Sequence, residues 1–294
     1  MSETGSTVPR RQLGRYLRDL RTQTGMTIPQ VAKLIERSPS TLQRIEKGEL
    51  PQKIRTVDIR ELCSVLGADD TMTAALTGLA EQANVKSWWH EYGNLIPKDF
   101  DVYMGLESAA ESLTSYSPDA VVGLLQHSDY VRVLARDVYP EGTPDEIEQR
   151  VHLKQRRQTL ITRKRQPAKL AVVLGEASLR RVVGSRKTMS NQLKHLADIS
   201  TLPNVSLRIL RFDAGIPMGD PLGRFIVLDF GLDARGASIE PSVVYLETFT
   251  GDMYLEKRID VQSYHEAHQA IQRAALDEQA SRDLLRQVAR EFSA

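Results

Sequence analysis

Residues 27–48 constrain the fold more than any other stretch, because they encode two short helices separated by about three residues. Thr27 is a typical N-cap residue, and Pro29 lies in the first turn, where a helix loses no hydrogen bond. Ser38 and Pro39 repeat this start signal, and Gly48 suits the left-handed conformation that ends a helix. Helices this short are not stable alone. The stretch therefore predicts a larger helical domain in which other helices bury both of them.

The apolar residues of the two segments recur at helical spacing, as in a DNA-binding helix-turn-helix. The predicted inward residues are Val31, Ala32, Leu34 and Ile35 in the first helix and Leu42 and Ile45 in the second. An ordinary helical hairpin within a larger α-helical domain is the alternative interpretation.

The run SPSTLQRIEKG resembles the recognition helix of the phage-repressor-like (Cro/C1, or XRE) helix-turn-helix family. The residues that fall on the family pattern are Ser38, Leu42, Gln43, Arg44, Ile45, Glu46 and Gly48. The sequence departs from the family at two positions. The family usually opens helix 2 with a Gln that contacts phosphate, where this chain has Ile28. The family commonly has Gly between the helices, and Glu36 at that position predicts a turn without a left-handed residue.

A recognition helix of this type enters the major groove by its N-terminal end, so that its first two turns reach base edges. The residues predicted to occupy those turns are Ser40, Thr41, Gln43 and Arg44. Gln43 suits a bidentate pair with adenine, and Arg44 suits guanine or a phosphate. The residues expected on the DNA backbone are Thr27, Ser38, Lys47 and Lys53. A solvated helix surface is the alternative for each of the eight.

Three more helices are predicted around this pair, over residues 12–24, 56–66 and 70–83, and residues 1–10 are expected to be disordered. Arg18 and Arg21 are candidates to pair with Glu46, which the family resemblance makes a structural residue. We therefore place a five-helix, repressor-like DNA-binding domain at residues 1–84. Residues 1–67 hold 12 Lys and Arg against 7 Asp and Glu, whereas the remainder holds 27 against 31. A basic head on a mildly acidic body fits DNA binding.

Residues 85–294 mix helices with alternating apolar segments, which predicts an α+β domain containing a mixed or antiparallel sheet. The predicted strands are residues 170–174 and the runs VSLRIL, GRFIVLDF, SVVYLETF and GDMYLEK, the last two joined as a hairpin. Phe100 to Leu113 is predicted as one helix, and helices over 261–276 and 281–292 close the chain. The second of these carries an apolar stripe that favours dimerisation.

Six elements in this region, among them WWHEYGNLIPKDFDVYMGLESAA, GLLQHSDYVRVL and MSNQLKHLADISTLPNVSLRIL, occur in a characteristic order. They resemble the C-terminal domain of WhiJ-like developmental regulators from filamentous, sporulating bacteria, which are often described as antitoxin-like. The resemblance implies a transcription factor that acts with a small partner protein encoded nearby. It implies no ligand and no catalytic residue.

Enzyme, metal and membrane functions find little support in the sequence. His265 and His268 in YHEAH are one residue short of the HExxH zinc motif, and no third ligand is evident. There is neither a phosphate-binding loop nor a GxSxG elbow, so we expect no catalytic activity, no cofactor and no metal. No apolar run approaches the ~20 residues needed to span a bilayer, and the N-terminus does not resemble a secretory signal. We therefore expect a cytoplasmic protein.

The sequence thus predicts a dimeric, sequence-specific transcriptional regulator, expected to be a repressor, that binds a palindromic operator in double-stranded DNA. Its C-terminal domain is expected to dimerise and to sense a partner protein or a signal. Two alternatives stay open. One is an antitoxin-like protein whose main role is to sequester a small partner, and the other is a regulator that responds to a small molecule.

Overall fold

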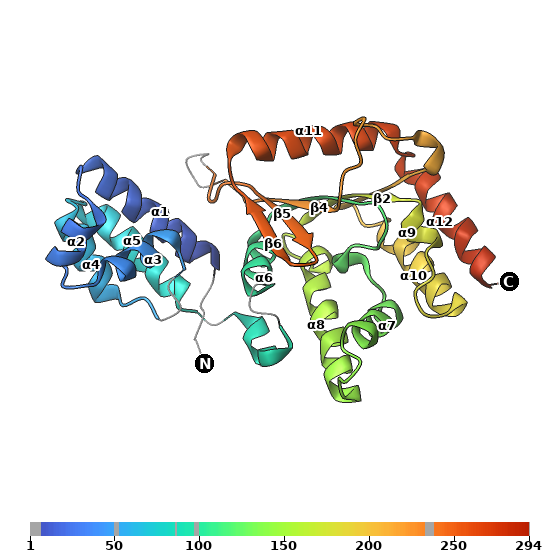
Figure 1. Cartoon of the computed structure of the whole chain (residues 1–294), viewed down its shortest axis with the longest axis horizontal. Helices are drawn as coiled ribbons and strands as arrows, with labels where there is room; N and C mark the ends of the chain where they lie inside the picture. The colour runs from blue at the N-terminus through green and yellow to red at the C-terminus, as the bar shows by residue number, and fades with distance from the viewer. Residues whose placement is uncertain (1–6, 50–52, 86, 97–99, 233–237, 294) are drawn as a thin grey trace. The chain divides into compact units, whose positions relative to one another are not determined.

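The computed structural model describes residues 7–49, 53–85, 87–96, 100–232 and 238–293. The fold is α+β, as predicted, and the chain divides into two compact units. The first unit comprises Met1–Gly93, Phe100–Ala109 and Leu232–Glu240, and the second comprises Asn94–Asp99, Ala110–Gly231 and Pro241–Ala294. The helices and strands of each unit are labelled in Figure 1. No helix among these described residues has both the length and the apolar character needed to cross a membrane.

The first unit is built on five helices that share one core. They are α1 (Thr7–Gln23), α2 (Ile28–Leu34), α3 (Pro39–Lys47), α4 (Thr56–Val65) and α5 (Asp70–Ala83), followed by the 3₁₀ segment η1 (Trp88–Leu95) and α6 (Phe100–Ala109). The core runs from Leu13 to Ala83, and its largest fully buried side chains include Leu17, Leu42 and Leu62. The two short helices are therefore buried by longer neighbours, as their length requires.

Helix α1 begins at Thr7, so the prediction of a disordered segment through residue 10 is wrong from Thr7 onward. Two residues explain the extra turn. Val8 is buried, and the buried Arg10 donates from Nε to the carbonyl oxygen of Ala83 at 3.2 Å. The Arg10 contact depends on the distant end of α5, which local sequence patterns do not reveal.

The second unit is built on one six-stranded sheet in the order β3-β2-β1-β4-β5-β6. The strands are β1 (Ser112–Ser117), β2 (Lys169–Gly175), β3 (Val205–Leu210), β4 (Phe225–Asp229), β5 (Val243–Thr248) and β6 (Gly251–Leu255). Strands β1, β2 and β3 are parallel, whereas β4, β5 and β6 pair antiparallel. The predicted mixed sheet, including the β5–β6 hairpin, is therefore confirmed.

Strand β1 corrects the prediction of one helix from Phe100 to Leu113, because α6 ends at Ala109 and the chain then becomes extended. The strand lies at the centre of the sheet, between β2 and β4. Leu113 is buried, and the Ser115 hydroxyl donates to the carbonyl oxygen of Phe225 at 3.0 Å. The polar run SLTSYS carries a weak strand signal, so its sheet pairing overrides its local preference.

Helices cover both faces of the sheet. They are α7 (Ser128–Val138), α8 (Pro144–Thr162), α9 (Ala177–Arg180), α10 (Arg186–Ile199), α11 (Arg258–Ala274) and α12 (Glu278–Ser293), with short 3₁₀ turns η2 (Gly123–Leu125) and η3 (Phe212–Ala214). Figure 1 shows α11 on one face and α8 and α10 on the other. Val261 and Ile271 of α11 pack on Tyr116, Phe225 and Val244.

The apolar stripe of α12 has a partner inside the same chain. Leu285, Val288 and Ala289 are buried, and α12 packs mainly against α10. The Ser190 hydroxyl of α10 hydrogen-bonds that of Ser293 at 2.8 Å. The stripe is therefore part of the fold, and the prediction that it favours dimerisation loses its basis.

Candidate nucleic-acid interface

The start of α2 is fixed by a reciprocal cap between Thr27 and Gln30. The Gln30 backbone N–H donates to the Thr27 hydroxyl at 3.4 Å, while the Gln30 side-chain oxygen accepts from the Thr27 backbone N–H at 2.8 Å and from its hydroxyl at 2.9 Å. This is the capping-box arrangement, with Gln at the third position. Because the oxygen of Gln30 is engaged, its amide NH₂ is the part of this exposed side chain that remains for an outside acceptor.

The turn between α2 and α3 contains a left-handed residue, contrary to the sequence prediction. Glu36 has φ 51°, in the region that glycine adopts freely and other residues adopt at a cost. The Arg37 backbone N–H donates to the carbonyl oxygen of Ala32 at 2.9 Å, which closes the end of α2. The backbone here therefore has the geometry expected with Gly, and Glu36 accommodates it.

The start of α3 is fixed by a small hydroxyl network. Ser38 caps the helix by accepting from the Thr41 backbone N–H at 3.2 Å. Its hydroxyl also lies 2.9 Å from that of Ser40 and 2.8 Å from that of Thr41. At the other end, Gly48 is left-handed with φ 69°, as the sequence predicts. The predicted boundaries of α3 therefore follow from its own end residues.

Helix α3 separates an inward face from an outward face. Leu42, Ile45 and Glu46 are buried, whereas the side chains of Gln43, Arg44 and Lys47 are exposed. Arg44 lies back along its own helix, because its Nε donates to the carbonyl oxygen of Ser40 at 3.3 Å. Gln43 and Arg44 therefore lie on the solvent-exposed face of a helix that is capped at both ends.

The other predicted DNA contacts lie at the starts of α2 and α3 and in the loop before α4. Ser38 and Ser40 are exposed and Thr41 is half-buried at the N-terminus of α3, and Thr27 is exposed at the N-terminus of α2. Lys53 is exposed in the loop before α4. Thr27 and Ser38 are also the N-caps of α2 and α3. A contact between either hydroxyl and phosphate would therefore use the same oxygen atom that caps the helix.

Glu46 anchors α3 to α1 through a bidentate ion pair with Arg21. The Nε–Oε1 distance is 2.6 Å and the Nη2–Oε2 distance is 2.8 Å. Arg21 is thus the partner that the sequence left open between Arg18 and Arg21. Both side chains are mostly buried, and the hydrogen bond with Glu46 raises the pKa of Arg21. Paired, partly buried charges of this kind fix geometry as well as contribute energy.

Two residues near the interface escaped sequence reasoning. Gln30 was not predicted, although Thr27 followed by Gln three residues later is a recognisable capping-box signal. Arg37 pairs with Asp58 of α4 at 2.8 Å and links the turn to the next helix. No local signal predicts the Arg37 contact, because its partner lies 21 residues away.

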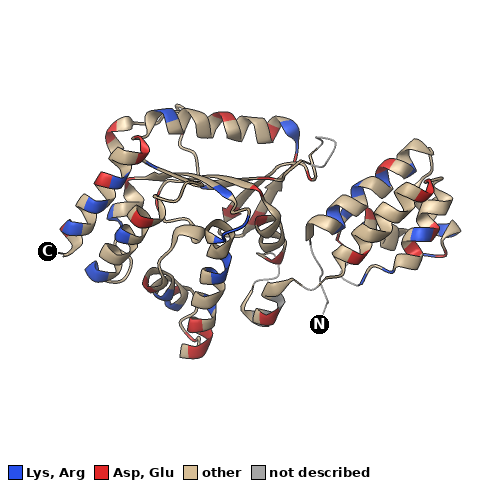
Figure 2. Cartoon of the chain, turned by 180° about the vertical axis from the view of Figure 1, so that it is seen from behind, with Lys and Arg blue, Asp and Glu red and all other residues tan. Residues whose placement is uncertain are grey.

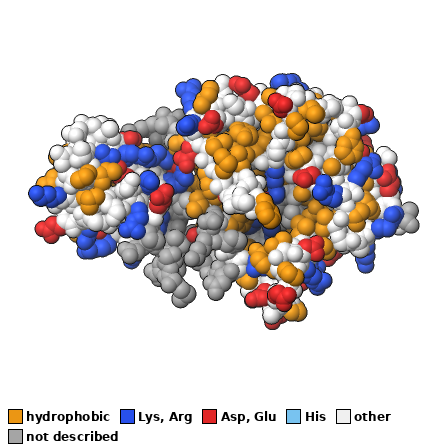
Figure 3. Space-filling view, viewed as in Figure 1, with side chains coloured by type: hydrophobic (Ala, Val, Ile, Leu, Met, Phe, Trp, Pro, Cys, Tyr) orange, Lys and Arg blue, Asp and Glu red, His pale blue; other side chains and the backbone are white. Residues whose placement is uncertain are grey.

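Basic residues recur along α1 in the ribbon of Figure 2, and the basic side chains seen on the helical unit in Figure 3 alternate with acidic and hydrophobic ones. Part of this charge is internally balanced, since Arg21 pairs with Glu46 and Arg37 with Asp58. The exposed cations of the described surface that suit contact with phosphate include Arg44, Lys47 and Lys53.

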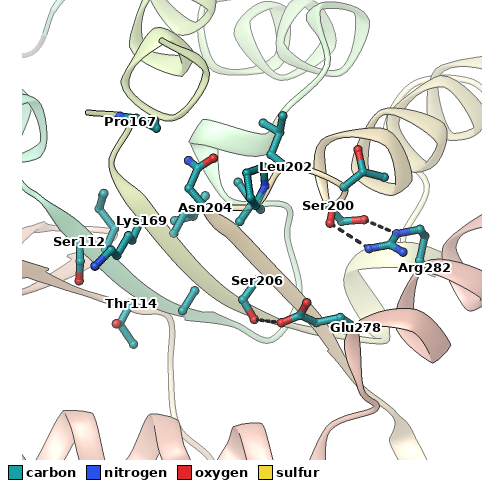
Figure 4. Close-up of a pocket in the computed structure, with 16 residues that line it drawn as sticks. Ser112, Thr114, Pro167, Lys169, Ser200, Leu202, Asn204, Ser206, Glu278 and Arg282 are labelled. Carbon is teal, nitrogen blue, oxygen red and sulfur yellow. Dashed lines mark hydrogen bonds between the residues drawn. The ribbon is translucent and has the colours of Figure 1, made fainter. Parts of the chain in front are cut away.

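The second unit has an open hollow of about 650 Å³ at the start of its parallel strands. Figure 4 shows its floor formed by β1, β2 and β3, with Glu278 and Arg282 of α12 at one side. Glu278 accepts from the Ser206 hydroxyl at 2.6 Å, and Arg282 donates to the Ser200 hydroxyl and carbonyl oxygens at 3.1 and 3.0 Å. The volume is that of a small-molecule site, and its lining mixes polar residues such as Lys169 and Asn204 with apolar ones such as Leu170 and Leu202.

The two histidines of YHEAH do not share a site. His265 Nε2 lies 3.3 Å from Oδ1 of Asp229, and this hydrogen bond raises the pKa of His265. His268 is buried, and burial lowers its pKa to about 4. Across the described ranges, no group of three or more His, Cys, Asp or Glu side chains could hold a metal ion.

Residues 100–287 match a protein family described as a domain of unknown function, DUF5753, and this match covers more than half of the chain. The chain belongs to the DUF5753 family. Residues 12–76 of this DUF5753 protein match a helix-turn-helix domain, which places the protein among DNA-binding regulators and confirms the XRE-type prediction. The DUF5753 match is consistent with the predicted WhiJ-like C-terminal domain. No curated protein and no solved structure matches the chain.

Proposed function

We propose that this DUF5753 protein is a sequence-specific regulator of transcription that binds double-stranded DNA through the outward face of α3. The observation that carries the proposal is the exposure of Gln43 and Arg44 on a helix whose two ends and inner face are all fixed. Gln43 would pair with adenine and Arg44 with guanine or a phosphate. Ser40 and Thr41 would lie near base edges, and Thr27, Ser38, Lys47 and Lys53 near the backbone.

Dimeric binding is part of the proposal, because the first 67 residues carry a net charge of only +5 and a single domain of this kind gives weak affinity. Two copies related by two-fold symmetry would require a palindromic operator with half-sites about one helical turn apart. Sedimentation of the full chain with operator DNA tests this, and a one-to-one complex at micromolar concentration would refute it. Repression would follow where the operator overlaps a promoter.

Within this proposal, residues 1–84 form the DNA-binding domain and residues 85–294 form a regulatory domain that senses a partner protein or signal without catalysing a reaction. Like the bacterial WhiJ-like regulators that it resembles, the protein would act in the cytoplasm, where the chromosomal DNA lies, and no resident cofactor or metal is needed. The hollow lined by Ser206, Glu278 and Arg282 favours a small polar ligand as a second candidate signal. Thermal unfolding in the presence of a library of polar metabolites tests for that response.

The deciding experiment is selection of bound sequences from random duplex DNA by the full chain. We expect a palindrome whose defined bases become degenerate with Gln43→Ala and with Arg44→Ala. Arg290→Ala, which removes an exposed arginine from α12, is the matched control and should select the same palindrome as the unchanged protein. Failure of the unchanged protein to enrich any sequence, alone or with cell extract added, would overturn the proposal.

A further inference from the structure

A buried carboxylate, that of Glu240, contacts α1 from the segment Leu232–Glu240 of the same compact unit. Its Oε1 accepts from Arg11 Nε at 2.9 Å and its Oε2 accepts from Arg15 Nη1 at 2.5 Å. Arg15 also donates to the carbonyl oxygen of Ile239 at 3.2 Å. The Glu240 side chain is completely buried. Arg11 and Arg15, four residues apart on one face of α1, therefore hold both carboxylate oxygens.

A carboxylate buried in this way is stable only while its cationic partners stay in place. Loss of either guanidinium would leave the buried carboxylate with fewer compensating charges, so displacement of Glu240 relative to α1 is energetically costly. The two arginines retain some exposure, 16% for Arg11 and 27% for Arg15, and can be solvated when Glu240 is removed. The ion pairs therefore fix the position of Glu240 on α1.

Residues 11–14 of α1 pack directly against the C-terminal end of α3, with no room for an additional side-chain atom between the two backbones. A Cβ built on Gly14 would lie 2.6 Å from the carbonyl oxygens of Ile45 and Glu46, and one built on Gly48 would lie 2.9 Å from the backbone of Arg11. About two turns further along α1, Arg21 pairs with Glu46. A shift of α1 near Arg11 and Arg15 must therefore displace the C-terminal half of α3.

We propose that Glu240 is a positioning residue for the recognition helix, acting through Arg11, Arg15 and α1. This inference rests on the proposed DNA binding. Glu240 lies three positions before the first residue of β5 in the chain. Through its contact with α1, Glu240 would set the affinity of α3 for its operator.

The test is a double-mutant cycle in the full chain with Glu240→Gln and Arg15→Gln. We expect each single variant to bind the selected operator roughly fivefold or more weakly, and the double variant to be no weaker than either, because one interaction is lost in all three. The dependence of affinity on salt should stay unchanged, since a positioning residue neutralises no phosphate. Glu247→Gln, which removes a different glutamate–arginine pair, is the control.

Three outcomes of the binding measurements would overturn the inference. They are unchanged affinity in Glu240→Gln, strictly additive losses, and tighter binding, the last of which would mean that Glu240 competes with DNA for the arginines. Amide hydrogen exchange without DNA separates this inference from the function itself. Faster exchange of α3 in Glu240→Gln, at unchanged melting temperature, would support the positioning role even if the unchanged protein bound no DNA, whereas unaltered exchange would reject it.

Discussion

Glu36 shows how one residue sets the local stability of the interface. Its backbone lies in the left-handed region with φ 51°, and its side chain is exposed at the turn that orients α3. Glycine adopts this conformation without steric cost, whereas other residues adopt it at a cost of about 1 kcal/mol. The turn is therefore a place where the sequence departs from the residue that its backbone favours.

We expect Glu36→Gly to stabilise the helical unit by up to about 1 kcal/mol, because relief of the left-handed strain outweighs the entropy that glycine gains in the unfolded chain. Thermal or urea unfolding of the full chain measures the change. Glu36→Ala keeps a Cβ at the same φ and should bring no such gain. Equal stability of the Gly and Ala variants would show that the turn is not strained.

His268 makes stability depend on pH. Burial lowers its folded pKa to about 4, while the unfolded value is about 6.5. Between these values the unfolded chain binds more protons, so stability should fall as pH decreases from 6.5 towards 4. His268→Leu should flatten this part of the pH–stability curve. His152→Gln, at an exposed histidine of α8, should leave the slope as it is, and an unchanged slope in His268→Leu would contradict the assignment.

At the scale of elements, the contact between α1 and α3 depends on the absence of a side chain at Gly14. A Cβ there would lie 2.6 Å from two backbone carbonyl oxygens, so α1 must separate from α3 to admit it. Alanine normally stabilises a helix interior relative to glycine by about 1 kcal/mol. Here the packing cost should exceed that preference.

We expect Gly14→Ala to destabilise the helical unit by about 1–3 kcal/mol and to weaken operator binding, because α3 loses its support. Gly78→Ala provides the matched control, since a Cβ at Gly78 of α5 meets nothing within 4 Å. That variant should be slightly more stable than the unchanged protein. Unfolding curves of the two variants, which should shift in opposite directions, measure both effects.

The elements that the sequence predicted well carry their signals locally. Helix α3 has its own caps in Ser38 and Gly48, and strands such as VSLRIL alternate buried and half-buried residues. Strand β1 and the first turn of α1 were missed because their stability comes from distant partners, β4 in one case and Ala83 in the other. The prediction of a turn without a left-handed residue was wrong for a related reason. The turn imposes a left-handed backbone on Glu36, although a residue with a side chain does not favour that conformation.

For the whole molecule, the distribution of charge predicts how operator binding responds to salt. The first 67 residues are basic and the remainder is mildly acidic, so phosphate contacts should come from the helical unit. We expect Lys53→Gln to weaken binding to all sequences and to reduce the slope of log affinity against log salt by about 0.9. Gln43→Ala should change sequence preference with the slope unchanged. Titrations at several salt concentrations measure both, and equal slopes for the three proteins would remove Lys53 from the interface.

The central place of β1 has a consequence for the order in which the chain folds. Residues 13–83 complete the helical core by themselves, so this core can form as soon as that part has left the ribosome. Strand β1 must wait for β2, because Lys169 of β2, the partner of Ser112, lies 57 positions further along the chain, beyond α7 and α8. It must then also wait for β4. Such distant pairings form slowly. During synthesis, the helix-turn-helix should therefore fold before the sheet. DNA binding should then become possible before the second unit, which is proposed to regulate it, has formed.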